Sequence, residues 1–182
     1  MGSVRIIAGI YRSRIIKFPN EVEGLRPTSN RVREVLFNWL LQDLSGKTCL
    51  DLFGGSGALG FEAASRNAIR VDIIEKNYKV YQALLHNKKL LKIDTVNIIR
   101  ADALSFLGKA EDGNRYDIWF LDPPYDSNLL NECLGLMLAK NLVMPRQLIY
   151  IEYQNEPDLT KFEIIKQGNA GVVCYALIKV IR

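Results

Sequence analysis

Residues 50–60 read LDLFGGSGALG and join an apolar run to a segment with helical periodicity. The glycines follow the run directly, where a strand must turn sharply into a helix. Glycine permits that turn, and without a Cβ it lets a ligand approach the backbone closely. The stretch therefore predicts a strand, a ligand-binding loop and a helix in succession, the unit from which α/β folds are built.

The rest of the chain repeats this alternation. Short, nearly wholly apolar runs occupy residues 48–53, 71–75, 96–100, 116–121 and 148–152. Helical patterns lie between them at 58–66, 77–92, just after Asp102 and at 127–139. Such runs are typical of parallel strands buried on both faces. Two closing runs, 162–166 and 172–180, are joined by a short glycine-containing link that predicts a hairpin. We expect a Rossmann-like α/β fold with a mostly parallel seven-stranded sheet and an antiparallel C-terminal strand.

The first part of the chain is of a different kind. Residues 4–7 and 14–18 are predicted to form a small β-hairpin or ribbon, followed by a loop that contains two prolines. A helix then begins near Thr28 or Ser29, and its apolar residues recur at helical spacing on one stripe. Arg31 and Asn38 fall off this stripe and stay available. We therefore divide the chain into an N-terminal arm, residues 1–27, and a main domain, residues 28–182.

The composition is that of one globular domain. The chain has 182 residues, 48% apolar and 24% charged, and no apolar run long enough to span a membrane. The N-terminus has no signal core. Three scattered cysteines without metal-ligand spacing predict a reducing compartment and no metal site. We expect a soluble, cytoplasmic protein that acts as a monomer.

The positive charge is concentrated at the N-terminus. Residues 1–33 carry seven basic and two acidic side chains, whereas the remaining 149 residues carry 17 basic and 18 acidic ones. A basic patch on a near-neutral body favours a polyanionic partner such as nucleic acid. The alternative is an ordinary solvated surface that happens to be basic.

Acidic residues follow three successive predicted strands: Asp51, Glu75 and Asp102. Glu75 lies 20 residues beyond Gly55, where a carboxylate can bind ribose hydroxyls. The glycines also satisfy GxGxxG, so a dinucleotide cofactor is an alternative. Asp51 would repel a pyrophosphate but suits a cationic ligand such as S-adenosylmethionine, and Asp102 could accept from an adenine amino group. Each acid could instead cap the following helix.

The second motif is Asp122-Pro123-Pro124-Tyr125, after the fourth strand. The prolines fix φ and remove two backbone donors, which leaves a stiff corner rich in acceptors. Asp122 and the Pro123 carbonyl could accept hydrogen bonds from an exocyclic amine, and Tyr125 offers a ring on which a base can stack. The alternative is a simple turn that ends the strand.

These motifs resemble those of the class I S-adenosylmethionine-dependent methyltransferases that methylate amines. Several further stretches are similar to the bacterial RsmD-type family: 5–9, 12–14, 25–28, 33–40 and 50–62. That family methylates a guanine N2 of small-subunit (16S) ribosomal RNA. The chain departs from the family at Ser13, where glycine is common, and at Gly54, where alanine is usual.

The resemblance implies a role for specific residues of this chain. Those implied to bind S-adenosylmethionine are Asp51, Phe53, Gly55, Gly57, Glu75, Asp102 and Ala103. Those implied to hold the target base and act in catalysis are Asp122, Pro123, Pro124 and Tyr125. Those implied to grip phosphates of ribosomal RNA or of an assembling small subunit are Arg5, Arg12, Arg14, Arg26 and Arg31. Asn38 is expected near the pocket.

Three other functions stay open. A DNA adenine-N6 methyltransferase also uses an Asp-Pro-Pro-Tyr motif, although 182 residues leave no room for a separate target-recognition domain. An NAD-dependent oxidoreductase would explain the glycines but not Asp51 and Asp122. A non-catalytic RNA-binding module would explain the basic arm but not the acids at the strand ends.

Overall fold

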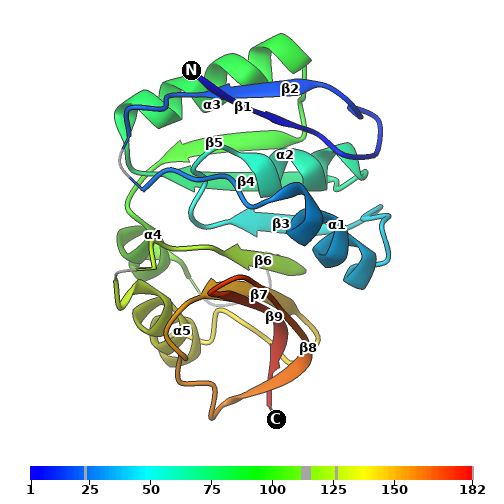
Figure 1. The fold of residues 1–182 in the computed structure, drawn as a ribbon. Coiled ribbons are helices and arrows are strands. Elements are labelled where there is room, and N and C mark those ends of the chain that lie inside the picture. The colour runs from blue at the N-terminus through cyan, green and yellow to red at the C-terminus, as the bar shows by residue number, and fades with distance from the viewer. Residues whose placement is uncertain (23, 112–115, 126, 182) are drawn as a thin grey trace.

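A central twisted sheet forms the body of the protein (Figure 1), as seen in a computed structural model that describes residues 1–22, 24–111, 116–125 and 127–181. Within these residues the sheet has seven strands in the order β5-β4-β3-β6-β7-β9-β8. The strands are β3 (Thr48–Asp51), β4 (Arg70–Glu75), β5 (Val96–Arg100), β6 (Ile118–Leu121), β7 (Leu148–Tyr153), β8 (Phe162–Ala170) and β9 (Val173–Val180). β3 to β7 are parallel, and β9 runs antiparallel to both neighbours. This confirms the predicted fold class.

Helices cover both faces of the sheet, because alternate residues of each strand point to opposite sides. Cys49 and Phe120 belong to a core cluster with α1 (Asn30–Trp39), α2 (Ala58–Ser65) and α3 (Tyr78–Leu91). Leu50 and Trp119 belong to a second cluster with α4 (Ala103–Lys109) and α5 (Leu129–Ala139). The near-continuous apolar runs are thus explained by burial on both sides. In the described ranges no helix combines the length and apolarity needed to cross a membrane.

The strand order reverses direction at one point of the sheet. From β3 the chain continues to β4 and β5 on one side, whereas β6 and β7 lie on the other. Loops that leave neighbouring strands there diverge, and ligands of open α/β sheets bind in the resulting crevice at the carboxyl ends. Asp51 ends β3 and Asp122 directly follows β6, so the two sequence motifs meet at this point.

The N-terminal hairpin, β1 (Gly2–Arg5) with β2 (Ile15–Phe18), lies beside α3 and α2 (Figure 1). The buried Asn87 of α3 clamps β2, since its side chain accepts from Lys17 N at 3.1 Å and donates to Lys17 O at 2.8 Å. The hairpin loop packs tightly on α2 at Gly9, which has φ +80°. A Cβ atom at this position would lie 1.8 Å from the Ser65 carbonyl oxygen, so only glycine fits. The arm is therefore docked on the main domain.

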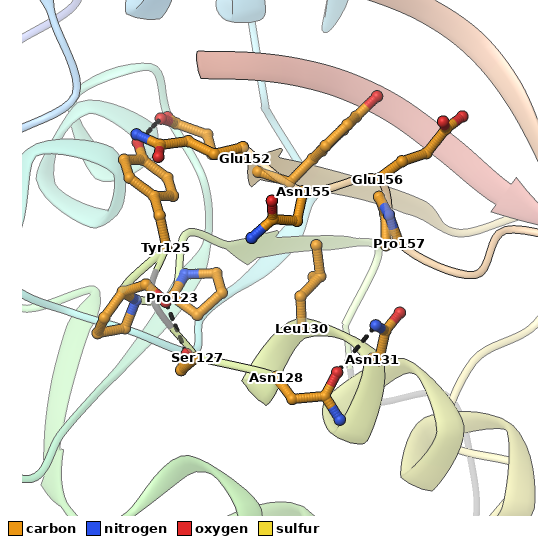
Figure 2. Close-up of a pocket in the computed structure, with 13 residues that line it drawn as sticks. Pro123, Tyr125, Ser127, Asn128, Leu130, Asn131, Glu152, Asn155, Glu156 and Pro157 are labelled. Carbon is orange, nitrogen blue, oxygen red and sulfur yellow. Dashed lines mark hydrogen bonds between the residues drawn. The ribbon is translucent and has the colours of Figure 1, made fainter. Parts of the chain in front are cut away.

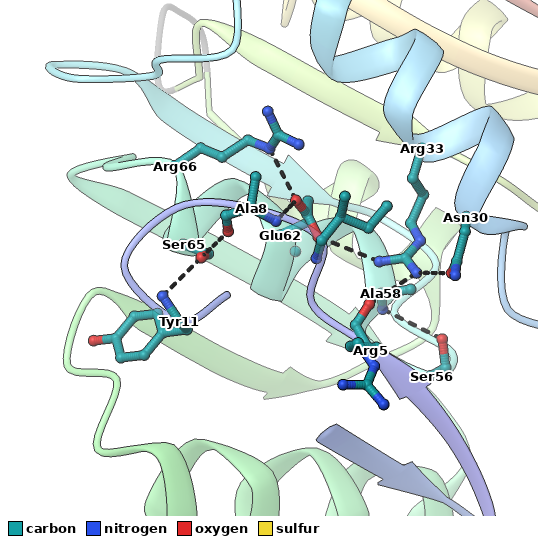
Figure 3. Close-up of polar contacts among 12 residues, drawn as sticks. Arg5, Ala8, Tyr11, Asn30, Arg33, Ser56, Ala58, Glu62, Ser65 and Arg66 are labelled. Atoms are coloured by element: carbon teal, nitrogen blue, oxygen red, sulfur yellow. Dashed lines mark hydrogen bonds and ion pairs between the residues drawn. The ribbon is translucent and has the colours of Figure 1, made fainter. Parts of the chain in front are cut away.

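Glu62 of α2 holds the same loop in place (Figure 3). Its fully buried carboxylate accepts from the backbone N–H groups of Ile7 and Ala8 and pairs with Arg33 and Arg66. Arg33 also donates to the Arg5 carbonyl oxygen, so the first strand of the hairpin is tied to α1 through the same network.

Two local details refine the sequence predictions. The closing hairpin is tighter than expected, because β8 continues to Ala170 and the turn lies at Gly171, which has φ +63°. Ser13 has φ +69°, a left-handed conformation that favours glycine and disfavours L side chains, so the glycine that the resemblance implies here would fit this turn better.

Candidate active site

A cleft of about 880 Å³ opens at the carboxyl ends of the central strands, beneath the loop that precedes α1. It brings together both sequence motifs, although they are some 70 residues apart in the chain. The predicted site residues that line it are Asp51, Phe53, Gly55, Glu75, Asp102, Ala103, Asp122, Pro123, Pro124 and Tyr125. Gly57 lies behind this surface. With φ +80° it starts α2, and its role is to let the backbone turn.

Asp51 is buried at the bottom of the cleft. Its Oδ2 accepts a hydrogen bond of 3.0 Å from Gly60 N, in the first turn of α2. Burial raises the pKa of this carboxyl to about 7. A group with such a pKa would be stabilised as the anion by a cation placed next to it. The site therefore favours a ligand with a positive charge at this point.

Glu75, at the end of β4, is held in one orientation by two backbone donors. Oε2 accepts from Gly55 N at 2.9 Å and Oε1 from Asn77 N at 2.6 Å. Burial raises the pKa of this carboxyl as well. Each oxygen keeps a second lone pair, which suits paired hydroxyl donors such as those of a ribose.

Asp102 does two things in the structure. It is exposed, lines the cleft, and caps α4 by accepting from Ser105 N at 3.1 Å. The helix-capping alternative considered for this acid is thus also true of it. Asp51 and Glu75, by contrast, do not cap helices in this way: α2 has Gly57 at its N-cap and α3 has Asn77.

The Asp122–Tyr125 corner is part of a larger polar cluster. Thr28 donates from Oγ1 to Asp122 Oδ2 at 3.2 Å, and the hydroxyl of Tyr125 donates to Glu152 Oε2 at 3.0 Å. Tyr150 donates to the other oxygen of Glu152 at 2.8 Å. Burial raises the pKa of Asp122, and the charge of Glu152 raises it further. Burial likewise raises the pKa of Glu152.

Sequence reasoning missed Thr28 and Glu152. Glu152 had a signal: it closes an apolar strand run in the same way as Glu75 and is brought to the same edge of the sheet. Thr28 had none, because a threonine next to a helix start is commonly a capping residue. In the structure Ser29 performs that capping role, and Thr28 is left to bond Asp122.

The arginines of the first 33 residues separate into two groups. Arg5, Arg12, Arg14, Arg26 and Arg31 are all exposed, and Arg26 also lines the cleft. Arg33 is fully buried against Glu62, so one of the seven N-terminal positive charges counted in the sequence is not on the surface. Asn38 is exposed and is not among the described residues that line the cleft.

Comparison with known proteins assigns the family. The sequence matches the family described as Conserved hypothetical protein 95 over residues 4–179. It is 40% identical to ribosomal RNA small subunit methyltransferase D of Haemophilus influenzae, over 97% of this chain and 93% of that one. The chain belongs to the RsmD family. The Escherichia coli relative of the same description is 39% identical, over 97% of this chain and 89% of its own.

A solved structure confirms the fold of this RsmD family member. The Escherichia coli protein yhhF superposes with a TM-score of 0.85 at 40% identity, and the match covers 98% of both chains. The strand order and the antiparallel β9 are thus those of a methyltransferase fold.

Proposed function

We propose that this chain transfers a methyl group from S-adenosylmethionine to the exocyclic N2 of a guanine in small-subunit (16S) ribosomal RNA, in the cytoplasm. The observation that carries the proposal is that three strand-end acids and the Asp122–Tyr125 corner line one cleft. The first set suits a nucleoside with a cationic tail and the second an aromatic amine. Family membership supports the same reaction.

The cofactor side of the cleft fits the proposed group in charge and shape. Asp51, with its pKa of about 7, would face the cationic methionine portion, and Glu75 would accept from the ribose hydroxyls. Asp102 and Ala103 would lie against the adenine, and Phe53 and Gly55 complete the lining. Bound there, S-adenosylmethionine would supply an electrophilic methyl group on its sulfonium sulfur.

The other side of the cleft would prepare the amine. An aromatic amine is a poor nucleophile because its lone pair is delocalised into the ring. Asp122 and the Pro123 carbonyl would accept its two N–H groups and draw the lone pair out of conjugation, while Tyr125 stacks on the base. Thr28 holds Asp122 Oδ2 and Glu152 holds the Tyr125 hydroxyl, so both groups are positioned before the substrate arrives.

The proton need leave the amine only after the methyl group has been transferred. We assign Asp122 mainly an orienting role, since acceptors alone meet the needs of the transfer step. Its raised pKa would also allow it to receive the proton that the methylated amine releases.

The exposed arginines of the arm and of the start of α1 would bind phosphates. Arg26 lies at the cleft itself and would link the RNA backbone to the active site. Arg5, Arg12, Arg14 and Arg31 would extend that contact along the surface. The target guanine must leave its stack to enter the cleft, which costs a few kcal/mol and favours single-stranded or loop RNA.

The test is a labelling experiment. The protein and radiolabelled S-adenosylmethionine are incubated in three separate reactions, one with small-subunit particles, one with naked ribosomal RNA and one with duplex DNA. The labelled nucleoside is identified after digestion. We expect N2-methylguanosine from an RNA substrate. Labelled N6-methyladenosine, or labelling of DNA alone, would overturn the proposal.

Two substitutions at Asp122 separate its possible roles. Asp122→Ala is expected to abolish transfer while S-adenosylmethionine still binds within about twofold of the wild-type affinity. Asp122→Asn keeps an acceptor oxygen but cannot take a proton, so an orienting role predicts measurable residual transfer. Loss of cofactor binding in either variant would place Asp122 in the cofactor site instead.

A further inference from the structure

A second pocket, of about 450 Å³, adjoins the cleft. The two cavities share Pro123, Pro124, Tyr125, Glu152 and Gln154, so the Pro-Pro corner forms a wall common to both. The remaining walls come from the start of α5 and from the segment that follows β7 (Figure 2). No role for this pocket follows from the reaction proposed above.

The lining combines an apolar floor with a rim of carboxamides. Pro123, Leu130 and Pro157 are buried, and Figure 2 shows Leu130 rising from α5 between the two walls. Four carboxamide side chains border the pocket: Asn128, Asn131, Gln154 and Asn155. An apolar surface edged with carboxamide donors and acceptors is suited to a heteroaromatic ring.

Several of these polar groups are free to bind a ligand. Asn131 is occupied, because it donates to Asn128 Oδ1 at 3.0 Å and accepts from Asp158 N at 2.8 Å. That leaves the Asn128 amide N–H groups available. Among the residues that the structure describes, Gln154 and Asn155 have no side-chain hydrogen bond.

The charge of the pocket argues against a phosphate. Its described lining contains the carboxylates Glu152 and Glu156 and no lysine or arginine. A phosphate would be repelled, whereas the exposed arginines of the arm offer it far better sites. The occupant is therefore expected to be an uncharged ring with hydrogen-bonding edges, and a nucleobase has that chemistry.

We propose that this pocket binds the unstacked base next to the target guanine in the RNA strand, and so reads the identity of that neighbour. The inference rests on the proposed function. Two successive bases of an extended strand would lie on either side of the Pro123–Tyr125 wall, one in the cleft and one in the pocket. Asn128 and Asn155 line only the pocket and would contact the edge of the neighbouring base.

The experiment compares the wild type with an Asn128→Ala, Asn155→Ala double variant. The matched control is Gln167→Ala, which removes an exposed carboxamide on β8 that lines neither cavity. The wild type first labels a ribosomal RNA transcript, and the labelled nucleotide is mapped. Transcripts are then made with each other base at the positions on either side, and kcat and KM are measured for every pair.

We expect the wild type and the control to prefer one base at one neighbouring position by roughly tenfold in kcat/KM, and the double variant to lose that preference. Binding of S-adenosylmethionine, measured by calorimetry, should be the same in all three proteins. Equal treatment of all neighbours by the wild type, or a preference kept by the double variant, would overturn the proposal. A uniform fall in kcat alone would assign the pocket to the target base itself and also overturn it.

Failure of the proposed function would be visible separately. It would appear in the first step, as a labelled nucleotide other than guanosine, and the neighbour series would then be built around that nucleotide. The pocket is thus tested in either case. An effect of the double variant on particles but not on naked RNA would identify a protein occupant and refute base readout.

Discussion

Replacing Glu62 by glutamine would disturb the point where the arm, α1 and α2 meet (Figure 3). The carboxylate accepts four hydrogen bonds: from Ile7 N at 2.8 Å, Ala8 N at 3.1 Å, Arg33 Nη1 at 3.3 Å and Arg66 Nε at 2.9 Å. All four are donors. A glutamine side chain has one oxygen and one NH2 group. Its NH2 group would therefore replace an acceptor oxygen and point at N–H groups that are themselves donors.

The cost can be worked out from burial. Glu62 and Arg33 are both 0% exposed, so the substitution leaves an uncompensated cation inside the protein. Removing one partner of a buried pair typically costs about 3–5 kcal/mol. For a chain of this length each kcal/mol lowers Tm by about 2–4 °C, so Tm should fall by about 6–20 °C.

The measurement is thermal unfolding followed by circular dichroism, together with trypsin sensitivity at the arm. Glu34→Gln is the control, because it makes the same charge change at an exposed position of α1. We expect the control to unfold within about 2 °C of the wild type. A Glu62→Gln protein that behaves like the control would refute the idea that this network holds the arm in place.

Four further outcomes follow from the site and the arm. Because the pKa of Asp51 is raised to about 7, the free protein carries a proton on this carboxyl at acidic pH. As the pH increases toward 7, affinity for the cationic cofactor should therefore increase by up to tenfold per pH unit, and above 7 it should stay constant. Asp51→Asn should remove this pH dependence, as measured by calorimetry. Stability without ligand should fall, in urea titrations, as pH rises from about 4 through 7, since the folded state then ionises a buried acid. Asp102→Asn keeps a capping residue and should alter cofactor affinity at unchanged stability, whereas Asp102→Ala should also lose about 1 kcal/mol in those titrations. Arg12→Ala with Arg14→Ala should reduce the slope of log K against log salt for RNA binding by about 1.4, and an unchanged slope would remove them from the RNA contact.

The sheet could be predicted from the sequence because each parallel strand has a recognisable local pattern. Burial on both faces demands continuous apolar runs, and the acids that follow them mark where a polar ligand meets the strand ends. Asp51 and Asp122 were identified in this way, and the fold brings them to one cleft. Glu152 also follows an apolar strand run, and it could have been found by examining the acidic residue at the end of every predicted strand.

The docking of the arm could not be predicted in the same way, because its contacts with α2 and α3 join residues more than 50 positions apart. Glu62 and Asn87 did leave a trace, since each is a polar residue on the buried side of a helix. A buried polar side chain needs a partner, but the sequence does not say which one. Arg33 shows the reverse problem: counted as surface charge, it is in fact part of the core.

The attachment of the arm to α2 limits how the protein can be recombined. In this chain the hairpin loop fits Glu62 and Ser65 of α2. A chimera that receives residues 1–27 from a relative would place a loop shaped for the relative's α2 against the α2 of this chain. The unit that could be exchanged intact is instead the hairpin together with α1 and α2, and α2 begins directly after the glycine loop that lines the cleft. If the arm binds RNA and the glycine loop binds the cofactor as proposed, an exchange that alters one of these functions is expected to alter the other as well.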